Sequence, residues 1–283
     1  MEKKEIKIVG LDLDGTLLTD KKELLPYTKK VIGEALQNGT VVLVATGRPW
    51  TGVPEELREL PGMDYALTAN GARIIETRTG KVLEEHLLSK EAAKKAIAIG
   101  RKYDTLLEVY FDGQGYAQKD EIAQVKKYHK NPNMWDYFLR TRIAVDRLED
   151  LLDEKEGNLD KVQMLFADIE EREEAWKELE REGVFELVGS LQYNIEINAA
   201  GVNKGTGLVN LGKMLGIRRE EIMACGDGDN DIAMLKEVGF GVAMANAEEK
   251  VKAAADYITE SNNEEGAAKA IEKFVLKRGG ESC

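Results

Sequence analysis

Short apolar runs alternate with amphipathic stretches in the first part of the chain. Residues 6–13 and 40–45 are rich in aliphatic and β-branched side chains, which is typical of strands buried on both faces of a parallel sheet. Between them, residues 26–38 carry apolar side chains at helical spacing, and Gly39 follows as a helix stop. Residues 65–68 form the next predicted strand. Strand, helix and strand therefore alternate as in a doubly wound α/β fold.

The pattern changes in the middle of the chain. Between residues 87 and 190, charge-rich helical stretches alternate with strand-like runs at 106–111 and 161–166, as in an α+β layer. The first pattern then returns in the last part of the chain. We therefore predict an α/β core with a doubly wound, mostly parallel, Rossmann-like sheet, built from residues 1–86 and 191–283. An α+β cap domain at residues 87–190 is inserted into it.

Composition excludes several classes of protein. The chain has 283 residues, with 40 Lys and Arg against 52 Asp and Glu, so its formal net charge is −12. This charge repels nucleic acids and anionic membranes. No apolar run approaches the roughly 18 residues of a membrane helix, and no signal-like apolar stretch follows the N-terminus. We expect no nucleic-acid partner, no membrane partner and a cytoplasmic location, while the number of subunits stays open.

The choice of metal is restricted by the small number of soft ligands. The chain has two cysteines and two histidines: Cys225, Cys283, His86 and His129. These are too few for a Cys₄ zinc site or a histidine-rich metal centre. Carboxylates must therefore hold any bound metal, which suits a hard cation such as Mg²⁺.

The clearest motif is Asp12-Leu13-Asp14-Gly15-Thr16, directly after the first predicted strand. Residues two apart in a strand project to the same side, so Asp12 and Asp14 can face one ligand beyond the strand end. Gly15 allows the chain to turn away. One carboxylate can act as a nucleophile and the other as a general acid and base. An ordinary Asp-Gly turn is the alternative.

A second acidic cluster, GDGDND at residues 226–231, also follows a predicted strand. So many acidic and amide groups in one turn are unfavourable unless a cation lies among them. An Asp from each strand end, completed by a backbone carbonyl and a phosphate oxygen of a substrate, forms a reasonable Mg²⁺ site. A solvated turn that caps the following helix is the alternative, but capping does not account for all of the acids.

Two further segments offer partners for an anion. Thr46 and Gly47, at the end of the second strand, present a hydroxyl and backbone N–H groups to which a phosphate oxygen could bind, although Thr46 could equally cap a helix. Lys204 begins a predicted helix, where the helix dipole disfavours a lysine unless an anion lies nearby. Lys204 precedes Gly205 and Thr206, so the order of a P-loop is absent and we expect no nucleotide binding by that route.

These ordered motifs resemble those of the haloacid dehalogenase superfamily of phosphohydrolases, in its Cof-like branch with a type IIB cap. Residues 12–16 resemble motif one, 46–48 motif two, Lys204 motif three and 226–231 motif four. The resemblance implies a Mg²⁺-dependent phosphomonoesterase that acts through an aspartyl-phosphate on small phosphate esters. Sugar phosphates are the most plausible substrates.

The resemblance also implies roles for single residues. Asp12 would be the nucleophile, and Asp14 would be the general acid and base. Asp12 and Asp227 would bind Mg²⁺, together with the main-chain carbonyl of Asp14. Asp231 would position the motif-three lysine. Five residues would bind the phosphate group: Leu13, Thr46, Gly47, Lys204 and Asn230. Two residues after the second and third strands are further candidates for substrate contacts: Arg48 and Asn70.

Two other functions stay open at this point. A phosphotransferase or phosphomutase could use the same groups, because a sugar hydroxyl needs a base at Asp14 just as water does. A non-catalytic phosphoacceptor or metal-binding signalling module is a rival from a different class. The large inserted domain argues against a signalling module, which needs an exposed phosphorylation site.

Overall fold

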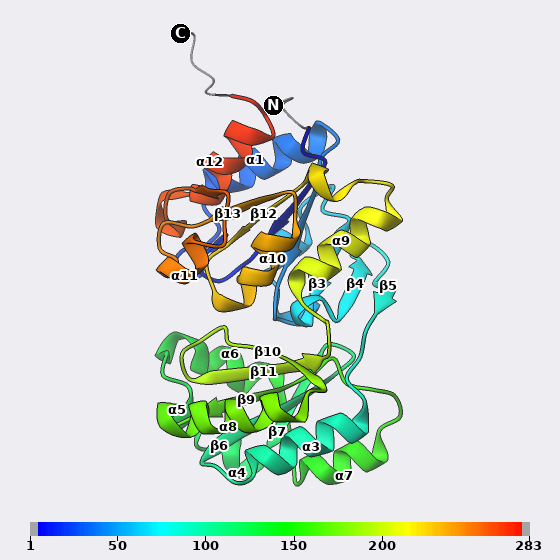
Figure 1. The fold of residues 1–283 in the computed structure, drawn as a ribbon, viewed down its shortest axis with the longest axis vertical. Helices are drawn as coiled ribbons and strands as arrows, with labels where there is room; N and C mark the ends of the chain where they lie inside the picture. Colours follow the sequence, from blue (N-terminus) through cyan, green and yellow to red (C-terminus); the bar gives the residue numbers. More distant parts are fainter. Residues whose placement is uncertain (1–4, 279–283) are drawn as a thin grey trace. The chain divides into compact units, whose positions relative to one another are not determined.

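The apolar runs at the two ends of the chain pair into one sheet, and the middle of the chain forms a second sheet (Figure 1). The structure is a computed structural model, which describes residues 5–278. It divides into two units. The first, called the core, consists of the described parts of Met1–Arg48, Val53–Glu84 and Asn203–Cys283. The second, called the cap, consists of Pro49–Gly52 and Glu85–Val202.

The core sheet has the strand order β14-β13-β12-β1-β2-β3-β4-β5. Its strands are β1 (Ile8–Leu11), β2 (Val41–Ala45), β3 (Tyr65–Thr68), β4 (Arg73–Glu76), β5 (Lys81–Glu85), β12 (Ile222–Gly226), β13 (Phe240–Ala243) and β14 (Tyr257–Ile258). All neighbours from β14 to β3 pair in parallel, and β3 and β4 are antiparallel. The carboxyl ends of β1, β2, β3 and β12 therefore lie along one edge of the sheet.

Helices cover both faces of the core sheet. The core helices are α1 (Pro26–Gln37), α2 (Glu55–Arg58), α9 (Lys204–Met214), α10 (Ile232–Glu237), α11 (Glu249–Lys252) and α12 (Gly266–Phe274). Figure 1 shows α1 and α12 together over one face, with α9 and α10 over the other. Apolar side chains of β1, β2 and β3 pack against α9 and α10. The predicted α/β class, with a doubly wound and mostly parallel sheet, is confirmed.

The cap is a six-stranded sheet with the order β10-β11-β9-β6-β7-β8. Its strands are β6 (Thr105–Phe111), β7 (Gln114–Gln118), β8 (Arg142–Val145), β9 (Lys161–Phe166), β10 (Phe185–Val188) and β11 (Asn194–Ala199). Its helices are α3 (Lys90–Gly100), α4 (Lys119–Ile122), α5 (Val125–Tyr128), α6 (Trp135–Thr141), α7 (Leu148–Glu154) and α8 (Ile169–Glu182). Only β7 and β8 pair in parallel among the described cap strands.

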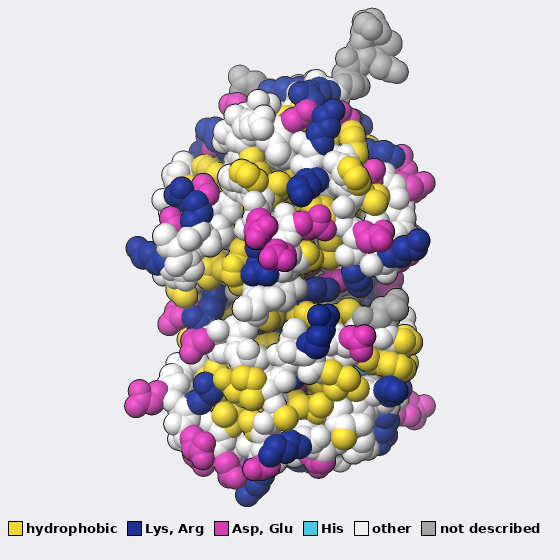
Figure 2. Space-filling view, turned by 180° about the vertical axis from the view of Figure 1, so that it is seen from behind, with side chains coloured by type: hydrophobic (Ala, Val, Ile, Leu, Met, Phe, Trp, Pro, Cys, Tyr) yellow, Lys and Arg dark blue, Asp and Glu magenta, His cyan; other side chains and the backbone are white. Residues whose placement is uncertain are grey.

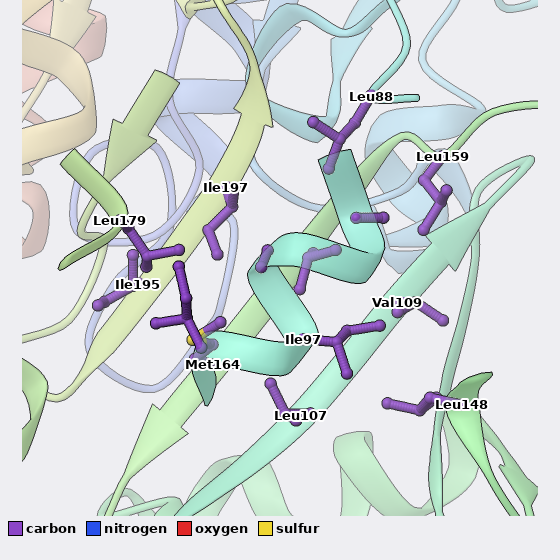
Figure 3. Packing of buried hydrophobic residues seen from close by; sticks show 14 of the residues in the cluster. Leu88, Ile97, Leu107, Val109, Leu148, Leu159, Met164, Leu179, Ile195 and Ile197 are labelled. Carbon is purple, nitrogen blue, oxygen red and sulfur yellow. The ribbon is translucent and has the colours of Figure 1, made fainter. Parts of the chain in front are cut away.

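The two faces of the cap sheet differ in polarity. Side chains alternate along β6, so Leu107 and Val109 point to one face and join the apolar cluster shown in Figure 3, with residues of α3, α7 and α8. Leu106, Glu108 and Tyr110 point to the other face. Leu106 packs there against apolar residues of α5 and α6. Glu108 and Tyr110, which follow it on the same face, have polar side chains.

Six short 3₁₀ helices complete the described elements: η1 (Trp50–Gly52), η2 (Ala69–Gly71), η3 (Pro132–Met134), η4 (Arg219–Glu221), η5 (Asp229–Asp231) and η6 (Asn262–Glu264). Within residues 5–278, no helix is both long enough and apolar enough to cross a bilayer. On the face drawn in Figure 2, basic and acidic side chains are interspersed rather than separated by sign.

The cap extends further along the chain than predicted. The sequence analysis placed residues 191–283 in the core, but β11 pairs in antiparallel fashion with β9 and β10 of the cap sheet. The longer segment of the second unit therefore runs from Glu85 to Val202. The pairing of β11 with β9 spans α8 and β10, so the local hydrophobic pattern did not reveal that β11 belongs to the cap sheet. Cys283 lies outside the described residues.

Leu107→Ala tests the cap core. Leu107 is fully buried in the cluster of Figure 3, so the substitution leaves a cavity and should lower the free energy of unfolding by about 2–5 kcal/mol. The matched control is Ile169→Ala, whose side chain is 54% exposed and which should change stability by less than about 0.5 kcal/mol. Chemical denaturation measures both values. Equal stability of the two variants would contradict this packing.

Candidate active site

Carboxylates follow two adjacent core strands at the point where each strand ends. Asp12 comes directly after β1 and Asp227 directly after β12, and the parallel register sets Leu11 beside Cys225. The backbone N–H of Asp12 donates to the carbonyl of Cys225 over 3.1 Å. Asp231 lies one turn beyond Asp227. Carboxylate oxygens of Asp12, Asp227 and Asp231 lie within 4.8 Å of one another.

A buried lysine lies between two of these carboxylates. Lys204 Nζ donates to Asp12 Oδ1 over 2.6 Å and to Asp231 Oδ1 over 2.7 Å, and its side chain is fully buried. Burial favours the neutral amine, but the two carboxylates outweigh burial and raise the pKa of Lys204. Lys204 begins α9, where the Asn203 side chain accepts from the backbone N–H of Thr206. Lys204 is therefore held as a cation at a helix start, as its unusual position indicates.

Both oxygens of Asp231 already accept hydrogen bonds. Its Oδ1 accepts from Lys204, and its Oδ2 accepts from the backbone N–H groups of Asp227 and Gly228, each over 2.9 Å. The close approach requires glycine at position 226, because a Cβ there would lie 2.5 Å from the Cβ of Asp231. Asp231 thus holds the loop and the lysine together.

Asp12 and Asp227 keep one oxygen each free of hydrogen bonds to the described residues. Lys204 occupies Asp12 Oδ1, and Thr16 Oγ1 donates to Asp227 Oδ1 over 2.6 Å. Gly15, with φ at +87°, passes so close that a Cβ would lie 2.2 Å from Asp227 Oδ2. Any larger side chain at position 15 would therefore fill the space beside that oxygen.

The electrostatics of this cluster favour a divalent cation. Three carboxylates face one ammonium group, which leaves excess negative charge in a buried place. Burial raises the pKa of Asp12 well above its usual range, with Lys204 opposing the shift. Burial, assisted by Asp231, raises the pKa of Asp227 to about 7. Free carboxylate oxygens with a poorly compensated charge are suitable ligands for a hard cation, so these residues fit Mg²⁺.

Asp14 has different partners from Asp12. Arg48 donates from Nε to Asp14 Oδ2 over 2.7 Å and from its Nη2 to Oδ1 over 2.6 Å, while Lys22 Nζ donates to Oδ1 over 2.7 Å. Burial would raise the pKa of Asp14, but Arg48 and Lys22 outweigh burial and lower it. Asp14 is therefore held as a carboxylate between two cations. Arg48, a candidate substrate contact, is engaged with Asp14 in this structure.

The remaining predicted residues form a linked set of loops. Thr46 Oγ1 accepts from the backbone N–H of Arg48 over 3.1 Å, and Thr46 O accepts from the backbone N–H of Asn70 over 3.0 Å. Asn230 Nδ2 donates to Asn70 Oδ1 over 3.5 Å. The side chain of Leu13 is fully buried, so only its backbone can face a ligand. The phosphate-binding roles of these residues, and of Gly47, stay predictions.

The sequence analysis missed two residues of this site, Thr16 and Lys22. Thr16 was quoted within the first motif without a role, and its hydroxyl donates to Asp227 across 211 positions of sequence. Lys22 stands in a run of charged residues that resembles an ordinary solvated turn. It reaches Asp14 because the chain turns back there with φ at +64°. Neither contact has a local signal in the sequence.

The fold and this carboxylate–lysine cluster together define a doubly wound α/β protein with an inserted cap and a cluster of buried carboxylates at one sheet edge. The family of haloacid dehalogenase-like hydrolases matches residues 9–271, and the chain belongs to that family. The predicted superfamily membership is confirmed.

Relatives align along nearly the whole chain. The 5-amino-6-(5-phospho-D-ribitylamino)uracil phosphatase YcsE of Bacillus subtilis is 33% identical over 276 residues, which cover 96% of this chain and 97% of that protein. A haloacid dehalogenase-like hydrolase from B. subtilis matches with a TM-score of 0.84 at 27% identity, covering 94% of this chain and 99% of that one. A sugar phosphatase of subclass IIB matches with a TM-score of 0.80 at 26% identity, covering 95% and 98%. These findings confirm the prediction of a hydrolase acting on phosphoric monoesters.

The substitution Asp227→Asn tests whether the carboxylate cluster carries excess negative charge, because removing one charge should then raise the free energy of unfolding. With a folded-state pKa of about 7 against an ordinary value of 3.8, Asp227 binds a proton in the folded state that the unfolded chain has released. Its contribution to stability is therefore lost as pH rises from about 4 to about 7. At pH 8, the metal-free variant should be more stable than the natural protein by about 1 kcal/mol, a rise in Tm of roughly 2–4 °C.

Thermal scans at pH 5 and pH 8 measure this difference, which should be smaller at pH 5. The matched control is Asp229→Asn at an exposed neighbouring position, where little change is expected at either pH. A Tm for Asp227→Asn below that of the natural protein at pH 8 would show that the ionised carboxylate of Asp227 does not destabilise the folded protein.

Proposed function

We propose that this protein is a Mg²⁺-dependent phosphomonoesterase that hydrolyses small phosphorylated metabolites, sugar phosphates in particular, through an aspartyl-phosphate on Asp12. The observation that carries the proposal is the contact of Lys204 with both Asp12 and Asp231, beside the free oxygens of Asp12 and Asp227. Two relatives support the substrate class, since one is named for a phosphoribityl compound and the other as a sugar phosphatase.

The proposed cation site uses two side chains and one carbonyl. Asp12 and Asp227 would bind Mg²⁺ through the oxygens that no described residue occupies, and Asp14 would contribute its main-chain carbonyl. Bound Mg²⁺ would neutralise the carboxylate and phosphate charges that must approach each other. Asp231 also lies in this cluster, although the sequence analysis did not name it as a ligand. Both of its oxygens accept hydrogen bonds from backbone N–H groups and from the Lys204 ammonium group. It therefore serves as a support for Lys204 in this proposal.

Asp12 would attack phosphorus with a carboxylate oxygen. A bond forms between that oxygen and phosphorus, and the bond between phosphorus and the ester oxygen breaks. Lys204 would hold Asp12 in position and offset the charge that spreads over the phosphoryl oxygens. Thr46, Asn230 and the backbone of Leu13 and Gly47 would orient those oxygens.

Asp14 would move the protons. It would protonate the leaving alkoxide oxygen, and in the second step it would take a proton from the water that attacks the aspartyl-phosphate, which releases inorganic phosphate and restores Asp12. In this structure Arg48 and Lys22 hold Asp14 as a carboxylate. This state suits the base step directly, whereas the acid step requires those contacts to loosen when substrate arrives.

Hydrolysis is favoured over the alternatives of phosphoryl transfer to a sugar and of a non-catalytic module. Relatives that cover nearly the whole chain are named phosphatases. A panel of phosphorylated metabolites, assayed for released phosphate with and without Mg²⁺, tests the proposal. Failure to release phosphate from any ester in the panel would contradict it.

Removal of Mg²⁺ should abolish turnover of a generic aryl phosphate at neutral pH, because the two carboxylates would then repel the phosphate. We expect a fall of at least about 100-fold with chelator and full recovery when Mg²⁺ is added. Phosphate release measures the rate. In parallel, Mg²⁺ should raise the Tm of the natural protein but not of Asp227→Asn. Full activity after exhaustive chelation would contradict the metal assignment.

Asp12→Asn should remove both turnover and covalent labelling, because an amide cannot attack phosphorus as a carboxylate does. The expected loss in kcat is at least about 10³-fold. Asp14→Asn should slow both half-reactions by about 10²–10⁴-fold while leaving Asp12 able to form a labelled intermediate. Steady-state rates and acid-quenched labelling with ³²P-phosphate ester distinguish the two variants. Stable labelling of Asp12→Asn would require a different nucleophile.

A further inference from the structure

One edge of the cap sheet exposes uncharged side chains in the middle of a strand. β8 is the last strand of that sheet, and among the described strands only β7 pairs with it. Ile143 is 47% exposed and Ala144 is also exposed, whereas Arg142 and Val145 at the strand ends are partly buried. Backbone N–H and C=O groups alternate in direction along a strand. The outer side of β8 therefore presents groups that can pair with a further strand.

The other three sheet edges within residues 5–278 are protected against such pairing. β14 has only two residues, and β5 carries charged side chains at three of its five positions: Lys81, Glu84 and Glu85. Every residue of β10 is partly buried. Short strands, charged side chains and covering segments are the devices that keep sheet edges apart. The one charged side chain of β8, that of Arg142, turns inward and donates from Nε to Glu108 Oε2.

The side chains of β8 alternate between the two faces of the cap sheet. Ile143 lies opposite Tyr116 of β7, which belongs to the apolar cluster of Figure 3, and Val145 packs against the same cluster. Ala144 lies on the other face, opposite Ala117. The apolar face of the cap therefore continues as far as this edge, where about half of the Ile143 side chain is exposed.

β8 is complementary to a second copy of itself. Two copies of an edge strand related by a two-fold axis normal to the sheet pair in antiparallel fashion, and directly opposed residues share a face. With the axis at Ala144, Ile143 of each copy lies opposite Val145 of the other. Arg142 then lies opposite Asp146, so no like charges oppose each other. This register combines two apolar pairs with two small side chains at the axis.

The neighbouring registers are less favourable. A shift by one residue would oppose side chains of different faces, which the alternation of the strand forbids. A shift by two places the axis at Ile143 or at Val145. Either choice keeps a single pair of aliphatic side chains, at the axis, instead of the two pairs of Ile143 with Val145. The sequence of β8 thus favours one register.

Electrostatic repulsion does not prevent this contact. Arg142 pairs with Glu108 inside the cap, and Arg147 Nη1 lies 3.8 Å from Asp150 Oδ1 in the same copy. The charges that give the chain its net −12 are spread along the whole sequence. At physiological salt, exposed charges more than about 8 Å apart are largely screened. The two copies can therefore meet at an edge that is itself mostly uncharged.

We propose that two copies of this protein associate through β8, so that their two cap sheets join into one sheet around a two-fold axis at Ala144. The contact uses the open edge of both copies, and the assembly therefore stops at a dimer. A pair of short strands buries less than the roughly 1,600 Å² of a standard interface. We expect a weak dimer with a Kd of about 1–100 µM. The contact involves none of the proposed catalytic residues.

Sedimentation velocity of the full chain between about 1 and 500 µM tests the proposal. The mass of the natural protein should rise from that of one chain toward that of two. Ile143→Lys places a charge at the contact and should raise the Kd by at least about tenfold. The matched control is Ile169→Lys on α8, because Ile169 is an apolar residue of the same unit that is 54% exposed. The control should dimerise as the natural protein does.

A charge exchange at the axis tests the register. Ala144→Glu and Ala144→Lys each set two like charges directly opposite one another, so each variant alone should stay monomeric in this range. An equal mixture of the two should form a dimer with a Kd within about tenfold of the natural value, because Glu then opposes Lys. Recovery in the mixture also shows that both variants are folded.

Three results would overturn the inference. A natural protein that stays monomeric up to about 500 µM would exclude a second copy at β8 and leave this edge to a strand of another protein. A dimer that persists in Ile143→Lys and in Ala144→Glu would lie elsewhere on the surface. Folded Ala144 variants that remain monomeric when mixed would exclude the axis at that residue. Because mass is measured rather than turnover, failure of the proposed phosphatase activity would not affect any of these results.

Discussion

The ammonium group of Lys204, buried between Asp12 and Asp231, is the interaction on which the active site depends. Three carboxylates within 4.8 Å could not all ionise in a buried place without it. The lysine neutralises part of this charge. Asp231 accepts hydrogen bonds from the lysine and from the backbone N–H groups of Asp227 and Gly228 with its two oxygens. The charge that remains lies on Asp12 and Asp227. The proposed roles of Asp12 as nucleophile and of both residues as cation ligands therefore depend on the same local excess of negative charge.

Hydrogen bonds distinguish the carboxylates of each unit from one another. In the core cluster, Asp12 and Asp227 each keep an oxygen that no described residue engages, which is why the proposed cation site uses them. In the cap, the buried oxygen without a partner among the described residues belongs to Glu108. Counting acidic residues would not separate these cases. Asp231 lies as close to the cluster as its neighbours do, but both of its oxygens already accept hydrogen bonds from the lysine and the following backbone.

The sequence predicted which of these residues lie together in the core because each motif is short and follows a strand. Asp12, Thr46 and Asp227 could be placed at one sheet edge from the pattern of apolar runs alone, since parallel strands align their carboxyl ends. Contacts made across long stretches of chain were not predictable. Lys22 reaches Asp14 through a turn with a left-handed residue, and Glu108 meets Arg142 only because β8 joins the sheet beside β7.

The position of β1 in the core sheet has a consequence for how the chain is made. β1 is central, and its neighbour β12 follows more than 200 residues later. During synthesis from the N-terminus, β1 can pair with β2 at once, whereas its other edge stays unpaired until the whole cap and α9 have emerged. An open central edge is prone to pair with other chains. The cap sheet, whose strands all lie within Thr105–Ala199, can close before that edge is covered. In this order of synthesis, the unit that carries Asp12 and Asp227 is the last to have all of its strands available.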